Sequence, residues 1–382
     1  MKLIVHLICI CMLYSCVNTN SKHDSVEINA LTIEGYDNPI KNNAEDLDVE
    51  IYKTIKLQTS EDNLLRNLTK VLIVNDSIVI VSDFNCVQGY SLDGDFICNY
   101  GTKGNGAGDY INLGGFFVNH NNEVVIIDNY RSTLLKYNLN GSFVGKIDIE
   151  KPTLQTVRDG LQVDNDIILF NEYITANDNP LYISYDIKKN EIIDEIPLPV
   201  HSDGIRYTIG QNPMTKYNDR ILLLNLLSPY LYDWKGNALF KFATKRKVLT
   251  KEYLEKISDY SFDTFADLYA KGIFMGFTDI YETSKYILCM CSNLEYILVD
   301  KQTLTCQKYD YTLNNTLPPI NINPIINIVG CYDDYYIGNL SYQSIMQNNK
   351  LTEALMKRWN CETSQDANPV LIFFQINRLK TD

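Results

Sequence analysis

Histidine is scarce in this sequence, with only 4 copies in 382 residues. Three of them, His23, His120 and His201, lie beyond the amino-terminal apolar run, and no two of these are close in sequence. The scarcity argues against a metal site built on several histidines. A G-x-S-x-G nucleophile elbow is also missing, which argues against an α/β-hydrolase serine site. We therefore assign no catalytic residue and expect no bound cofactor.

Long hydrophobic runs are absent as well. The apolar stretch from Leu3 to Tyr14 is too short to span a bilayer as a permanent helix and predicts a secretory signal. It ends in Leu-Tyr-Ser-Cys at residues 13–16, which resembles a bacterial lipobox. The sequence thus predicts a signal peptide over residues 1–15 and a lipid anchor on Cys16. The alternative is an ordinary signal peptide with an incidental cysteine.

Residues 16–47 have no sustained hydrophobic period and are rich in Asn, Ser, Asp and Lys. This composition predicts a lipidated, flexible tether. Surface-exported lipoproteins of the Bacteroidetes type commonly carry an acidic cluster directly after the cysteine, whereas Val17 to Lys22 contains no acid. The predicted location is therefore the outer membrane, facing the periplasm in preference to the outer surface.

Positive charge is in deficit, because 34 Lys and Arg stand against 47 Asp and Glu, giving a net charge of −13. This balance disfavours nucleic acid and anionic lipid surfaces as partners. The densest basic cluster, Lys245-Arg246-Lys247, is short and predicts a solvated loop. The expected contact with a membrane is through the lipid anchor alone.

The 10 cysteines form no recognisable framework. Three fall in the predicted signal or at the lipidation site, and the remaining seven have irregular spacing, which fits neither paired disulfides nor a zinc motif. Cys289 and Cys291 are expected on one face of a strand, since side chains alternate with period two. Two buried small hydrophobes are favoured there over a metal pair.

What the sequence does contain is a repeat. The stretches Ser77–Gly101 and Glu123–Ile149 each show an apolar run ending in Asp, a polar turn, a strand with a central Tyr, and a tight turn before a third strand. Gly94 and Gly141, in those tight turns, are 47 residues apart, which is the length of a four-stranded propeller blade. Asn190 and Gly236, 46 residues apart, extend the register over two further blades.

The remaining strands complete a ring. Blades five and six are expected from Tyr286 and Cys331 onward, and the alternating strand Asp48–Leu57 is expected to pair with Pro369–Asn377 and remove two sheet edges. Stretches 250–271 and 341–359 predict small helices. The predicted fold is all-β: a six-bladed β-propeller over residues 48–382 with small helical insertions.

One loop carries a family resemblance. Residues 104–110, with Gly104, Gly106, Gly108, Asp109 and Tyr110, are similar to a G-x-G-P-G-E-Y pattern between the first two blades of six-bladed β-propeller lipoproteins of Bacteroidetes. These are relatives in shape of NHL-repeat and TolB-like propellers, so the resemblance implies fold and envelope location more than chemistry. Because no helix is predicted after the glycines, a structural crossover turn is favoured over a phosphate loop.

A binding face is expected just after the inner strands, from polar and aromatic side chains that suit a glycan, peptide or protein partner. The candidates are Asp83, Asn85, Asp128, Tyr130, Arg131, Arg206 and Tyr207. The same residue types also form turns by bonding their own backbone. One alternative is a carbohydrate- or lactone-directed hydrolase or lyase in which such side chains hold a divalent ion such as calcium. Another is a scaffold subunit of an envelope complex, which would expose a large apolar patch.

Overall fold

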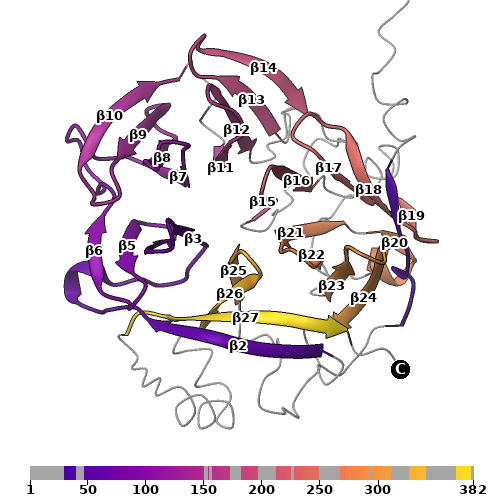
Figure 1. The fold of residues 1–382 in the computed structure, drawn as a ribbon. Coiled ribbons are helices and arrows are strands. Elements are labelled where there is room, and N and C mark those ends of the chain that lie inside the picture. Colours follow the sequence, from indigo (N-terminus) through magenta and orange to yellow (C-terminus); the bar gives the residue numbers. More distant parts are fainter. Residues whose placement is uncertain are drawn as a thin grey trace, which may run out of the picture.

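The structure is a computed structural model that describes residues 30–39, 47–149, 154, 157–172, 182–196, 212–224, 228–248, 267–274, 276–291, 295–310, 327–340 and 367–379. Six small antiparallel sheets stand around a central axis, so the molecule is a six-bladed β-propeller (Figure 1). Within the described residues no helix is long and apolar enough to cross a membrane.

Each blade is a four-stranded antiparallel meander. From the axis outward, blade 1 is β3 (Lys70–Val74), β4 (Ile78–Ser82), β5 (Val87–Ser91) and β6 (Phe96–Asn99); blade 2 is β7 (Leu113–Val118), β8 (Val124–Asp128), β9 (Thr133–Tyr137) and β10 (Phe143–Asp148); blade 3 is β11 (Val157–Gln162), β12 (Ile167–Glu172), β13 (Tyr182–Asp186) and β14 (Glu191–Ile196).

The second half of the ring adds two outer strands from the amino-terminal part of the chain. Blade 4 is β15 (Met214–Tyr217), β16 (Arg220–Leu224), β17 (Tyr230–Tyr232) and β18 (Ala238–Phe242), with β1 (Leu31–Ile33) on its outer edge; blade 5 is β21 (Phe277–Glu282), β22 (Tyr286–Cys291), β23 (Glu295–Asp300) and β24 (Thr305–Asp310); blade 6 is β25 (Asn327–Tyr332), β26 (Tyr335–Leu340), β27 (Val370–Leu379) and β2 (Leu47–Lys56). A short parallel pair, β19 (Lys247–Val248) and β20 (Ile273–Phe274), follows blade 4.

The repeat register read from the sequence is confirmed by backbone conformation. Gly94, Gly141, Asn190 and Gly236 all have positive φ (93°, 85°, 60° and 81°) in the turn between the third and fourth strands of blades 1 to 4. That conformation costs little for Gly or Asn and more for other residues. The tight-turn residues therefore mark the same place in successive blades.

The predicted closure of the ring is confirmed. β2 pairs antiparallel with β27, from Leu47 opposite Leu379 to Lys56 opposite Val370, so the two ends of the propeller share blade 6. Ile55 and Leu57 are buried, whereas Tyr52 lies at an irregularity in the pairing and is 68% exposed.

The prediction of the inner strands was wrong. The apolar runs that lead to Asp83 and Asp128 form the second strands, β4 and β8, and the innermost strands are β3 and β7. Second strands have neighbours on both edges and both faces, so they carry the most apolar sequence.

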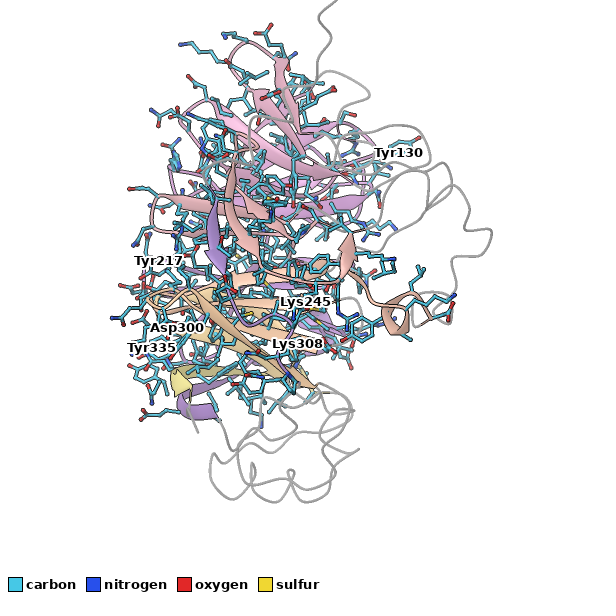
Figure 2. All side chains as sticks on the ribbon, turned by 90° about the vertical axis from the view of Figure 1, so that its right-hand side faces the viewer. Tyr130, Tyr217, Lys245, Asp300, Lys308 and Tyr335 are labelled. Carbon is cyan, nitrogen blue, oxygen red and sulfur yellow. The ribbon has the colours of Figure 1, made fainter. Side chains whose placement is uncertain are left out.

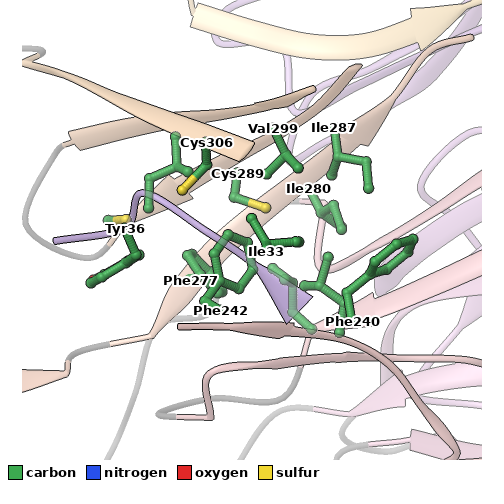
Figure 3. Packing of buried hydrophobic residues seen from close by; sticks show 14 of the residues in the cluster. Ile33, Tyr36, Phe240, Phe242, Phe277, Ile280, Ile287, Cys289, Val299 and Cys306 are labelled. Carbon is green, nitrogen blue, oxygen red and sulfur yellow. The ribbon is translucent and has the colours of Figure 1, made fainter. Parts of the chain in front are cut away.

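Part of the predicted flexible tether is ordered. Residues 30–39, here called the strap, run across the outer edges of blades 4 and 5: β1 lies parallel to β18, and the backbone of Glu34 bonds to Leu304 and Cys306. Ile33 and Tyr36 are buried, and Figure 3 shows both beside Phe242. The Tyr36 ring also packs against that of Phe274. The strap therefore joins two neighbouring blades by both backbone and side-chain contacts.

Apolar clusters fill the spaces between adjacent blades. Cys289 and Cys291 are buried in the cluster beneath the strap, as their period-two spacing predicts, together with Cys306. The six cysteines in the described part of the chain carry free thiols. Of the two predicted helices, only residues 267–271 are described, and they include one helical turn at 267–270. A short 3₁₀ segment that was not predicted, η3 (Glu61–Asn63), precedes blade 1. The stretches 250–266 and 341–359 lie outside the described residues.

Candidate ligand-binding site

Asp83 directly follows β4 and organises the turn after the strand. One carboxylate oxygen accepts hydrogen bonds from the backbone N–H groups of Asn85 and Cys86 (2.7 and 2.9 Å), and the other accepts from the N–H of Arg66 (3.2 Å). The residue is only 4% exposed. Its oxygens therefore hold two chain segments together.

Asp128 has the same place in blade 2 and is completely buried. It accepts from four backbone N–H groups, those of Ile111 (3.0 Å), Asn112 (3.3 Å), Tyr130 (3.1 Å) and Arg131 (3.3 Å). The first two belong to the segment entering blade 2 and the last two to the turn after β8. Asp128 thus repeats the turn-forming role of Asp83, in the way expected of Asp at a strand end.

The glycine-rich loop at 104–110 connects β6 to β7 and is built around Asp109. The Asp109 carboxylate accepts from the hydroxyl of Thr102 and the N–H of Gly106, both at 2.8 Å, and a Cβ on Gly104 or Gly106 would collide with it. Those hydrogen bonds, with a smaller contribution from the charge of Arg131, lower the pKa of Asp109. The loop is consequently shaped by its own carboxylate.

Contacts from both neighbouring turns fix this loop. Arg131 donates to the carbonyl oxygens of Asp109 (2.5 Å) and Gly104 (3.1 Å), and the Tyr110 hydroxyl donates to the carbonyl of Asn85 (2.8 Å). The turn after β4, the glycine-rich loop and the turn after β8 form one hydrogen-bonded surface. We call residues 83–86, 102–110 and 128–131 the loop face.

Two aromatic rings project from the loop face. Tyr130 is 71% exposed, and Phe84, which directly follows Asp83, is 65% exposed. Figure 2 shows the ring edge-on, with Tyr130 on one side and Tyr217, Asp300 and Tyr335 on the other. Sequence reasoning overlooked Phe84, although a lone aromatic residue in an otherwise polar turn was a usable signal.

The predicted site residues thus fall into three groups. Asp83, Asp128 and Arg131 make the framework, while Asn85 and Tyr130 face solvent beside Phe84. Arg206 and Tyr207 lie outside the described residues, as does Cys16. The described residues include no cluster of three His, Cys, Asp or Glu side chains that could hold a metal ion.

A cavity of about 440 Å³ lies on the propeller axis and is lined by residues from all six innermost strands. In it, the Lys70 ammonium group contacts both carboxylate oxygens of Asp159 (2.7 and 2.9 Å) and the carbonyl of Phe116 (3.1 Å). The ion pair joins blade 1 to blade 3, and the bond to Phe116 joins blade 1 to blade 2. Burial raises the pKa of Asp159, and the nearby Lys70 opposes that shift.

Further hydrogen bonds cross the axis. The Asn212 side-chain amide donates to the carbonyl of Thr69, the residue before β3 of blade 1 (3.3 Å), and to the hydroxyl of Tyr281 in blade 5 (2.9 Å). The Tyr281 hydroxyl in turn donates to the carbonyl of Ile328 in blade 6 (2.7 Å). Asn75, Asn122 and Asn218 line the cavity from turns between first and second strands, on the side of Tyr217. The cavity is therefore spanned by polar contacts at the end nearer the loop face.

The sequence matches the family model described as a domain of unknown function (DUF4934) over residues 27–375. The chain belongs to this family. The matched region of this DUF4934 propeller includes the strap and ends within β27. A comparison with curated proteins found no match to the sequence.

Two solved structures share the fold of the DUF4934 propeller. A predicted exported protein from Bacteroides fragilis is 19% identical, with a TM-score of 0.67, and the match covers 92% of this chain and 100% of that one. A member of the duf4221 family from Bacteroides vulgatus is 9% identical, with a TM-score of 0.52, covering 87% and 99% of the two chains. At these identities the similarity establishes the fold alone.

Proposed function

We propose that this DUF4934 propeller is a lipid-anchored envelope protein that binds a ligand at the loop face. The observation that carries the proposal is the pairing of a rigid framework with exposed aromatic rings. Phe84 and Tyr130 are both more than half exposed, and the turns that hold them are fixed by Asp83 and Asp128. A site whose loops are already ordered loses little conformational entropy on binding.

The amino terminus supports an envelope location. The apolar run, the lipobox-like residues at 13–16 and the similarity in fold to a predicted exported protein agree with export and with acylation of Cys16. Replacing Cys16 by Ser should release the protein from the membrane fraction if the cysteine carries lipid. A membrane-bound Cys16→Ser protein would contradict the anchor without affecting the binding proposal.

Binding is favoured over catalysis at the loop face because the acids there already have partners. A general acid or base must reach the proton it transfers, yet the Asp83 and Asp128 oxygens are buried and accept backbone N–H groups. The enzyme alternative is supported by a residue outside the loop face. Asp159, in the axial cavity, has a carboxyl group whose pKa is raised by burial. If the protein were a hydrolase or lyase, its catalytic acid would therefore be expected in the axial cavity.

The test compares retention of envelope components by three immobilised proteins. The wild type and a Tyr52→Ala control should retain the same glycan, peptide or protein, and the double variant Phe84→Ala, Tyr130→Ala should lose it. Tyr52 is a suitable control because it is 68% exposed and stacks on Tyr335, which lies on the opposite side of the ring. Equal retention by all three proteins would remove the loop face from the proposal.

A further inference from the structure

We propose that the ligand of the loop face is a neutral glycan chain that stacks on Phe84 and Tyr130. This inference rests on the proposed function and adds the chemical class of the ligand. It follows from which side-chain groups of the loop face remain available after the internal contacts of its charged residues are counted.

Four charged side chains of the loop face, those of Asp83, Asp109, Asp128 and Arg131, already have partners within the protein. The Asp83 and Asp128 carboxylates accept backbone N–H groups, and Asp109 accepts from Thr102 and Gly106. The Arg131 guanidinium donates to two carbonyl oxygens and lies 3.7 Å from Asp128. A charged ligand would have to compete with these contacts, and breaking those of Asp83 and Asp128 would leave partly buried backbone donors without partners.

Apart from Lys103, the groups of the loop face that meet solvent are mainly aromatic rings and neutral amides. Phe84 and Tyr130 are the most exposed large hydrophobic residues of the loop face, and Asn85 and Asn105 are exposed beside them. The Asn105 side-chain oxygen accepts from Arg131 (3.3 Å), which leaves its NH₂ group for a ligand. An aromatic face carries negative charge density and is apolar, so it suits the C–H face of a sugar ring. Amide groups can donate to and accept from sugar hydroxyls. The combination matches a polyhydroxylated, uncharged ligand.

The arrangement of the two rings favours a chain over a single sugar. Phe84 follows β4 and Tyr130 follows β8, so the rings stand on corresponding turns of adjacent blades with the glycine-rich loop between them. Each ring can contact a different sugar unit. The net charge of −13 opposes acidic polysaccharides over the whole surface. Lys103, within the loop face, and Arg66, beside it, are exposed, so an anionic ligand is the principal competing outcome.

The experiment is affinity electrophoresis of the full chain in gels containing dextran, yeast mannan, barley β-glucan, polygalacturonate or chitosan, at low and high salt. At least one neutral polymer should retard the wild type, and salt should not change the retardation because no charge pair forms. Phe84→Ala and Tyr130→Ala should each weaken the apparent affinity about tenfold, as expected for aromatic anchors. Tyr52→Ala should leave it unchanged. Thermal unfolding of each variant establishes that it is folded.

Three results would overturn the inference. Retardation by polygalacturonate or chitosan alone, abolished by salt, would show that the ligand is charged. Retardation by a neutral polymer that survives both substitutions would place the glycan elsewhere. No retardation by any of the polymers would exclude the glycan class. In that last case, retention of a peptide or protein that requires Phe84 and Tyr130 would leave the proposed function standing.

Discussion

Replacing Asp128 by Ala should destabilise the propeller strongly, because Asp128 is completely buried and accepts four backbone hydrogen bonds. Two of these, from Ile111 and Tyr130, have good geometry at 3.0 and 3.1 Å. Leaving those two donors unpaired costs about 1–3 kcal/mol each, so we expect a loss of about 2–6 kcal/mol in the free energy of unfolding. Asp128→Asn keeps one acceptor oxygen and should lose about 1–2 kcal/mol.

Urea unfolding followed by tryptophan fluorescence measures this change as a shift in the transition midpoint at constant slope. Asp219→Ala is the matched control: Asp219 is an exposed residue in the turn between β15 and β16, and its removal should change stability by less than about 0.5 kcal/mol. If Asp128→Ala were as stable as that control, the carboxylate would not organise the turn.

Three other substitutions test the framework. Tyr36→Ala should lower the free energy of unfolding by about 3 kcal/mol, since it empties a buried site between blades 4 and 5, and thermal melts beside Tyr52→Ala measure the difference. Gly94→Ala should cost roughly 1–3 kcal/mol, because φ is 93° and a Cβ would overlap the Lys56 carbonyl oxygen; an unchanged melting temperature would disprove the turn. The Asp109 pKa is below 3.8, so its contribution to loop stability is complete above that pH and is lost as pH falls through the lower folded-state value. Protection of the Gly106 amide, measured relative to the intrinsic exchange rate at each pH, should fall over that acidic range, whereas in Asp109→Asn, which has no carboxylate to titrate, it should not change with pH.

The fold was accessible from the sequence because its determinants are local and repeated. Gly94, Gly141 and Gly236 mark turns that need positive φ, and only a few residue types adopt that conformation cheaply. The closing strands carry a period-two pattern that indicates pairing within a sheet. Spacing alone therefore gave the register of the blades.

The strap could not be predicted in the same way. Ile33 enters an apolar cluster, Glu34 contributes only its backbone, and Tyr36 packs against rings from two strands. Because these three contacts are unrelated, the strap shows no hydrophobic periodicity in its sequence. Its polar composition therefore predicted a flexible tether. Only the partners supplied by blades 4 and 5 distinguish the two outcomes.

The candidate site shows a similar limit. Asp at the end of a strand is expected both in ligand sites and in turns, and residue type does not separate them. The structure separates them by partner: backbone N–H groups occupy the Asp83 and Asp128 oxygens, while Phe84 and Tyr130 have exposed rings. The aromatic residue that was overlooked is consequently more informative than the acids that were selected.

The strap also determines where a membrane anchor would join the ring. Cys16 and residue 30 are 14 positions apart, so a lipid on Cys16 would hold the outer edge of blade 4 within about 50 Å of the bilayer, whatever the conformation between them. In a ring of six blades, blades 1 and 2 lie opposite blades 4 and 5 (Figure 1). The turns that carry Phe84 and Tyr130 therefore belong to the half of the propeller remote from the attachment point, where a long ligand can approach without crossing the strap.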